Sequence, residues 1–258
     1  AQLALECARR HANLVLFSPE ADRQEQVAQR CRQAGAPVAV VIGDVTVPAD
    51  CARLASEAVE RFGRLDYLLA NAGISMWARF DQVEDLGIYR RLVEVNYLGA
   101  VNCIHFALPH LKDSRGMIVA VSSIQGRIAV PLHTGYVASK HALQGFCETL
   151  RMELHGTGVD VLEARAEVGL GGVDHTRGEG RPADQPCADD AAPVRQVVDG
   201  GQRRVRREMS GLQRQQPAAR HRPLEPAQPA ERVGGLLPVA GDRWIVFVLQ
   251  HRVGDAAG

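Results

Sequence analysis

The six cysteines of this 258-residue chain form no C-x-x-C pair, and its nine histidines lack the spacing of metal ligands. These absences argue against a zinc site and against a disulfide framework, and they favour free thiols in a reducing compartment. We therefore expect a cytoplasmic protein without a bound metal. No apolar run approaches the roughly 18 residues that a membrane-spanning helix needs. No signal peptide is visible either.

An excess of charge of either sign is also missing. The 30 basic and 30 acidic residues give a formal net charge of +0 at pH 7. Nucleic acids and anionic membranes select basic surfaces, so a balanced chain does not favour either partner. The cluster Arg203-Arg204-Val205-Arg206-Arg207 resembles a nucleic-acid patch, but acidic residues lie nearby. We expect no nucleic-acid and no membrane partner.

A tyrosine and a lysine four residues apart, Tyr136 and Lys140, are the most informative pair in the chain. On a helix their side chains share one face, one turn apart. A phenol has a pKa of about 10, and lowering it to about 7 or 8 requires roughly 3 to 4 kcal/mol. One ammonium about 4 Å away supplies roughly 4 kcal/mol at an effective dielectric near 20. Any helix can carry this pair, so its surroundings decide its meaning.

Further polar residues stand at fixed distances from this pair. Ser123 lies thirteen residues before Tyr136, at the end of the apolar run Met117 to Val121, and Asn96 lies forty residues before it. Two more groups directly follow apolar runs: Asp44-Val45 and Asn71-Ala72-Gly73.

In combination these residues resemble the short-chain dehydrogenase/reductase family. The family pattern is an N-A-G turn, an Asn in the following long helix, a Ser at a strand end and Y-x-x-x-K. The resemblance covers about residues 1 to 163. Within the family, the segments NAGIS, VNYLGAV, VSSIQG and GYVASKHAL are most similar to the 11β-hydroxysteroid-dehydrogenase-like branch.

The resemblance implies an oxidoreductase that transfers a hydride between NADP(H) and a carbonyl compound or alcohol of small size. Tyr136 would be the general acid in reduction and the base in oxidation. Lys140 would lower the pKa of Tyr136 and bind the nicotinamide ribose, and Ser123 would orient the substrate oxygen. Asn96 would interrupt its helix and hold a water molecule of the proton relay.

The resemblance also implies a set of cofactor-binding residues: Ser18, Asp44, Val45, Asn71, Ala72, Gly73, Tyr136 and Lys140. Asp44 would bond the adenine amino group, and Asn71 and Gly73 would line the cleft. Simpler explanations exist, because Asn71 and Gly73 suit a turn, Asp44 suits a helix cap and Ser123 suits a local hydrogen bond.

The end of the second strand of such a fold discriminates between the two nicotinamide dinucleotides. An acid there binds the ribose 2′-hydroxyl, and an arginine accommodates a 2′-phosphate. Here the strand ends at Phe17-Ser18-Pro19, without an acid, which favours NADP. Arg23 is a turn away and Glu20 is close, so NAD stays possible.

Continuous apolar runs alternate with helical periodicity along the first two thirds of the chain, which indicates a parallel sheet covered on both faces. We predict a doubly wound, Rossmann-like α/β fold. The predicted helices are 1–10, 20–34, 48–62, 86–111 and 136–154, and the predicted strands are 13–17, 37–42, 65–70, 116–122 and 159–162.

The family's first strand and its glycine-rich turn are missing, since the first glycine is Gly35. That turn brings the pyrophosphate to backbone amides at a helix N-terminus. The strand is central in the family's sheet, so we expect a gap in the sheet. We also expect that the chain as printed folds poorly and binds NADP(H) no better than millimolar.

A second departure follows Glu163, where the family pattern stops. We predict a core over residues 1–164 and an atypical tail over 165–258, irregular in structure. From Arg165 onward there is no Lys, Asn or Tyr. A disordered extension and a frameshift in a GC-rich gene both explain this composition.

Two other functions stay open: an inactive fragment, and a dinucleotide-binding scaffold without catalysis.

The long helices have apolar residues on more than one face. In the resembling family these helices pair between subunits. We expect a homodimer or homotetramer. The residues concerned are Val95, Leu98, Val101, Ile104, Leu143, Phe146 and Leu150.

Overall fold

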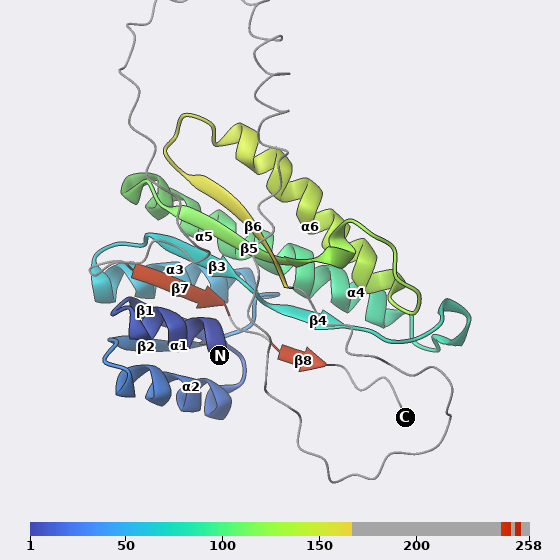
Figure 1. Ribbon diagram of the computed structural model, residues 1–258, viewed down its shortest axis with the longest axis horizontal. Coiled ribbons are helices and arrows are strands. Elements are labelled where there is room, and N and C mark those ends of the chain that lie inside the picture. Colours follow the sequence, from blue (N-terminus) through green and yellow to red (C-terminus); the bar gives the residue numbers. More distant parts are fainter. Residues whose placement is uncertain (167–243, 249–250, 254–258) are drawn as a thin grey trace, which may run out of the picture. The chain divides into compact units, whose positions relative to one another are not determined.

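The structure is a computed structural model, and it describes residues 1–166, 244–248 and 251–253. These residues form a six-stranded sheet in the order β2-β1-β7-β3-β5-β6, with every neighbouring pair parallel (Figure 1). The strands of this sheet are β1 (Asn13–Ser18), β2 (Val38–Ile42), β3 (Tyr67–Ala70), β5 (Met117–Ser123), β6 (Asp160–Ala166) and β7 (Trp244–Val248). The prediction of a Rossmann-like parallel sheet is confirmed.

Helices connect β1 to β2, β2 to β3, β3 to β5 and β5 to β6, as a parallel sheet requires. The helices are α1 (Gln2–Arg9), α2 (Ala21–Gln33), α3 (Pro48–Phe62), α4 (Gly87–Val93), α5 (Gly99–Ser114) and α6 (Thr134–Glu153). The shorter elements are the 3-10 turns η1 (Phe80–Gln82) and η3 (Ile124–Gly126) and the π-helical turn η2 (Glu94–Leu98). The predicted helix 86–111 is therefore α4, η2 and α5 in succession. None of the helices in the described part of the chain is both long and apolar enough to cross a membrane.

Alternation along the strands divides the core between the two faces of the sheet. Val15 and Phe17 of β1 face one large apolar cluster, whereas Leu14 and Leu16 point to the opposite face, where α1 and α2 pack on β1. Three helices contribute to the large cluster: α3 with Cys51 and Leu54, α5 with Cys103, Ile104 and Ala107, and α6 with Leu143, Cys147 and Leu150. Because α6 is fixed by this core, its first turn has a defined position against the sheet.

Helix α3 begins and ends where the sequence predicts. Pro48 stands at its first turn, where a missing N–H is not needed. Gly63 ends it in the left-handed conformation with φ of 80°, and its N–H donates to the Val59 carbonyl. This helix returns the chain to the next strand, β3.

The expected gap in the sheet is not there, so that expectation was wrong. Strand β7 lies between β1 and β3 and pairs in parallel with both (Figure 1). Val246, for example, pairs with Val15 on one side and with Leu68 on the other. The physical reason is that a central strand position can be filled by any extended apolar segment of the chain, and WIVFV is one.

A second, two-stranded sheet pairs β4 (Gly73–Ser75) with β8 (His251–Val253) in parallel. The prediction that the tail is irregular is therefore wrong for β7 and β8. Residues 167–243, which include the arginine cluster at 203–207, lie outside the described residues, so the choice between an extension and a frameshift stays open. The division of the chain after residue 164 stays a prediction as well.

Candidate functional site

The first turns of α6 bring Tyr136 and Lys140 together, as their spacing predicts. The Lys140 Nζ lies 5.7 Å from the centroid of the Tyr136 ring. It donates a hydrogen bond of 3.0 Å to the Val121 carbonyl of β5, and the side chain is almost entirely buried. The lysine thus reaches from α6 to the carboxyl end of the sheet.

Ser123 is the last residue of β5 and is buried next to Tyr136. Burial raises the pKa of Tyr136 above its ordinary value, and a hydrogen bond with Ser123 lowers it in part. The Ser123 Oγ also accepts a bond of 3.2 Å from the Gln125 N–H. The local bond that was the simpler explanation for Ser123 therefore exists, and it exists beside the bond to the phenol.

The expected lowering of the Tyr136 pKa by Lys140 is not found. The ammonium lies over the face of the ring, and the first cause acting on the phenol is burial. Lys140 is itself perturbed: burial lowers the pKa of its ammonium to about 8, and the Glu163 carboxylate raises it in part. The site therefore holds a neutral phenol beside an ammonium that loses its proton more readily than usual.

Asn96 lies in the π-helical turn η2 and is buried, and its side chain joins three elements. Its Oδ1 accepts from the Ile74 N–H at 2.7 Å, and its Nδ2 donates to the Ile74 carbonyl at 2.9 Å. The same Nδ2 donates to Ser139 Oγ at 2.9 Å, and that hydroxyl donates to the Tyr136 carbonyl at 2.8 Å. Asn96 thus links β4 to the turn of α6 that carries Tyr136.

Gly73 stands where these residues converge. A Cβ placed on it would lie 3.5 Å from Asn96 Oδ1 and 3.6 Å from Lys140 Nζ. The absent side chain therefore leaves a backbone surface open between the asparagine and the lysine. The structure brings Asn96, Ser123, Tyr136 and Lys140 together with Gly73.

The remaining predicted residues follow other strands. Ser18 ends β1 and is buried, with its Oγ accepting from the Glu20 N–H at 3.2 Å. Asp44 follows β2, and its Oδ1 accepts from Thr46 N at 2.8 Å and from Thr46 Oγ1 at 2.9 Å. Asn71 directly follows β3 and is partly exposed. The helix-cap explanation of Asp44 is wrong, because the N-cap of α3 is Val47 and Asp44 bonds Thr46 in the preceding turn instead.

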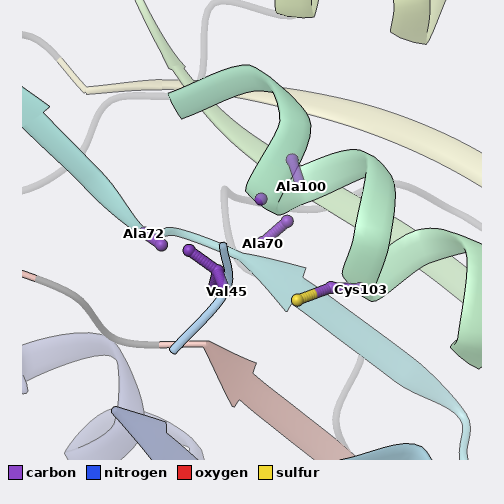
Figure 2. A pocket seen from close by; sticks show the side chains of 6 residues that line it. Val45, Ala70, Ala72, Ala100 and Cys103 are labelled. Atoms are coloured by element: carbon purple, nitrogen blue, oxygen red, sulfur yellow. The ribbon is translucent and has the colours of Figure 1, made fainter. Parts of the chain in front are cut away.

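Val45 and Ala72 meet at a small apolar hollow between the end of β3 and the start of α5 (Figure 2). Its lining is Val45, Ala70, Ala72, Gly99, Ala100 and Cys103. The hollow does not have room for a water molecule, so it is a packing defect and not a preformed adenine pocket. Cys103 Sγ lies 3.5 Å from Cys51 Sγ beside it.

The residues fit one end of a nicotinamide dinucleotide. The open backbone at Gly73 and the buried Lys140 suit the nicotinamide ribose. At the pyrophosphate end, no glycine-rich turn leads from a strand into a helix N-terminus among residues 1–166, 244–248 and 251–253. We therefore assign residues to the nicotinamide end only. No group of three His, Cys, Asp or Glu side chains in the described part could hold a metal ion.

Two aromatic residues near Tyr136 carry no motif and were missed in the sequence. His133 is buried, with its ring edge-on to that of Tyr136 at a centroid distance of 6.1 Å. Trp77 packs edge-on against His133 at 4.7 Å. Residues in loops have no periodicity that would reveal such contacts.

The fold is Rossmann-like, and the family model described as short chain dehydrogenase matches residues 1–177. The chain belongs to the short-chain dehydrogenase family. Among curated proteins it is 48% identical over 154 residues to 11-beta-hydroxysteroid dehydrogenase-like 4A of Arabidopsis thaliana, a match covering 59% of this chain and 52% of that protein.

Other relatives agree with this assignment. The chain is 41% identical over 156 residues to 11-beta-hydroxysteroid dehydrogenase 1A of Arabidopsis thaliana, covering 60% of this chain and 45% of that one. It thus spans about half the length of these relatives. Among solved structures it is similar to the alcohol dehydrogenase of the archaeon Thermococcus sibiricus complexed with 5-hydroxy-NADP. That match has a TM-score of 0.58 and 27% identity, and it covers 63% of this chain and 69% of the other.

Proposed function

We propose that this protein is an NADP(H)-dependent oxidoreductase that interconverts a carbonyl compound and an alcohol, with Tyr136 as general acid and base. The observation that carries the proposal is the convergence of Ser123, Tyr136 and the buried Lys140, whose Nζ lies 5.7 Å from the centroid of the Tyr136 ring. A serine hydroxyl and a phenol side by side are able to bond the same carbonyl oxygen. Membership of the short-chain dehydrogenase family supports the reaction class.

A nicotinamide cofactor, when bound, would supply or accept the hydride at the substrate carbon. Tyr136 donates its phenolic proton to the substrate oxygen in reduction, and it takes that proton back from the alcohol in oxidation. Ser123 bonds the same oxygen and orients it, and Lys140 binds the ribose from the surface beside Gly73. Because burial raises the pKa of Tyr136, the phenol is protonated at neutral pH and is able to donate its proton in reduction, but as a weaker acid than a free phenol.

The preference for NADP has two supports. The strand end Phe17-Ser18-Pro19 carries no acid that would bind a ribose 2′-hydroxyl. The similar archaeal alcohol dehydrogenase is complexed with 5-hydroxy-NADP. A steady-state comparison of NADPH with NADH as reductant tests this choice, and a preference for NADH would contradict it.

The first test of the function is Tyr136→Phe. We expect carbonyl reduction to fall by about 10² to 10⁴, because the proton donor is lost while the ring stays in place. Binding of NADPH, measured by titration calorimetry, should stay within about threefold, because only the proton donor is lost and the ring beside Lys140 remains.

The matched control is Tyr97→Phe, which changes a tyrosine that packs against Phe146 at a ring distance of 6.0 Å. It should keep the wild-type rate. If Tyr136→Phe keeps more than about a tenth of the activity, Tyr136 is not the acid. If NADPH binds but no aldehyde or ketone is reduced by the wild type, the non-catalytic scaffold replaces this proposal. Absence of both binding and turnover selects the inactive fragment.

We further propose a homodimer or homotetramer in the cytoplasm. Val95, Ile104, Leu143 and Leu150 are buried within one subunit, so they are not available to a partner. Leu98, at the end of η2, remains 42% exposed. Val101 of α5 and Phe146 of α6 are only partly buried, so these three are the apolar residues of the predicted set that a second copy is able to cover.

A further inference from the structure

Two loops meet beside Tyr136, one after β4 and one after β5. The Ala78 N–H donates to the Leu132 carbonyl at 3.0 Å. The Gly135 N–H, one turn before Ser139 of α6, points to Met76 Sδ at 3.3 Å. Leu132 has φ of 70°, a left-handed conformation that a bulky side chain rarely adopts. Strain of this kind persists only where neighbours hold it, and it gathers at functional sites.

The strained Leu132 is followed by His133, which is buried and fixed. Its Nδ1 lies 3.1 Å from the Pro131 carbonyl. A carbonyl only accepts, so Nδ1 carries a proton and the ring orientation is set. The ring then stands between two others: it is edge-on to Tyr136 at 6.1 Å and edge-on to Trp77 at 4.7 Å. A continuous series of rings therefore runs from Tyr136 to Trp77.

The outer end of this series is open to solvent. The Trp77 side chain is 60% exposed although one ring edge is held by His133. The same two loops carry other exposed large apolar residues, which are Phe80, Ile124 and Ile128. Exposed apolar surface that adjoins a polar reactive group is a mark of a ligand site. Both loops leave the carboxyl ends of strands, where ligands bind in parallel sheets.

We propose that Trp77 is a specificity-determining residue whose indole packs against a flat apolar ring of the substrate, and that His133 is the positioning residue that holds the indole beside Tyr136. This inference rests on the proposed function. The substrate carbonyl lies at Tyr136 and Ser123, and the ring attached to it lies along Trp77. Carbonyl compounds too small to reach Trp77 do not depend on it.

The test compares 1-naphthaldehyde with acetaldehyde, both reduced with NADPH. In Trp77→Ala and in His133→Ala, KM for 1-naphthaldehyde should rise about tenfold, the effect of losing one aromatic contact. In Trp77→Ala the kcat with either aldehyde and the KM for acetaldehyde should stay within about twofold, because acetaldehyde does not reach the indole. A misfolded variant would instead lose activity with both aldehydes. Trp77→Phe, which keeps a ring, should restore most of the 1-naphthaldehyde KM. The matched control is Met152→Ala, which removes an exposed apolar residue of α6 outside the two loops.

If the wild type reduces neither aldehyde, a binding measurement still tests the proposal. Titration calorimetry with 1-naphthalenemethanol, the alcohol of the test aldehyde, should give a Kd about tenfold higher for Trp77→Ala than for wild type. That result without turnover would support the role of Trp77 and reject the proposed reaction. Equal Kd values, no binding to the wild type, or equal losses with both aldehydes would overturn the role of Trp77.

Discussion

Lys140 shows at the scale of one residue how the site depends on its protein surroundings. Burial lowers the pKa of its ammonium from the ordinary 10.5 to about 8. A folded-state pKa below the unfolded one means that the unfolded chain binds more protons between these two pH values. The contribution of Lys140 to stability is therefore fully present above pH 10.5 and is lost as the pH falls through 8. The difference in pKa corresponds to roughly 3 kcal/mol.

Lys140→Met removes this titration. The free energy of unfolding of the wild type minus that of the variant should rise by roughly 2 to 3 kcal/mol between pH 7 and pH 10.5. Urea unfolding at a series of pH values measures it, and other titrating groups cancel in the difference. Lys112→Met, which removes an exposed lysine from α5, is the matched control. A difference that does not change with pH would show that Lys140 is not buried as an ammonium.

At the scale of elements, the π-helical turn η2 is what places Asn96 against β4. The turn adds one residue to the helical ladder, and π turns of this kind are frequent at functional sites. Asn96 uses its oxygen and both of its amide hydrogens in bonds to Ile74 and Ser139. That Asn96 holds a water molecule stays a prediction. The structure shows its bonds to protein groups.

Asn96→Ala should lower the free energy of unfolding by about 2 to 4 kcal/mol, since three buried groups lose their partner. Asn102→Ala is the control on the same helical segment, because Asn102 makes one bond of 2.9 Å from its Nδ2 to the Val45 carbonyl. It should cost about 1 kcal/mol. Equal losses for the two variants, measured by urea unfolding, would mean that the bonds of Asn96 do not join β4 to α6.

Local sequence patterns were sufficient to predict the bounds of the elements with strong periodicity. The predicted helix 48–62 and the observed α3 coincide, and the predicted strand 116–122 differs from β5 by one residue. The interruption of the long helix at Asn96, expected from the resemblance, is found at η2, but its form as a π turn was not predicted, because its extra residue leaves apolar spacing almost unchanged. Of the site, the relation of Tyr136 to Lys140 could be predicted from helix geometry. The direction of the Tyr136 pKa could not, because burial depends on packing between elements that are distant in the chain.

At the scale of the whole molecule, strand β7 is the element that local reasoning could not place. WIVFV is a short apolar run, and such a run does not reveal its partners. In the sheet it lies between β1 and β3, and both of these strands end more than 170 residues before β7 begins in the sequence. Pairing at this separation carries a large loop-closure entropy and forms late in folding. The sheet is continuous only with β7 in place.

Val246→Pro tests whether β7 is the central strand in solution. Val246 pairs with Val15 and Leu68, so a proline there removes an N–H and distorts ladders on both sides. We expect a loss on the order of 3 kcal/mol, or a fall in Tm of about 10 °C by circular dichroism. The matched control is Val40→Pro in β2, one of the two edge strands of the described sheet. The Gly43 N–H donates to the Ser18 carbonyl at 3.2 Å, so alternate amides face β1 and that of Val40 faces the open edge. Val40→Pro should therefore cost less than about 1 kcal/mol, because proline is tolerated at edges. If the two prolines have equal effects, or if Val246→Pro has none, β7 does not hold the centre of the sheet.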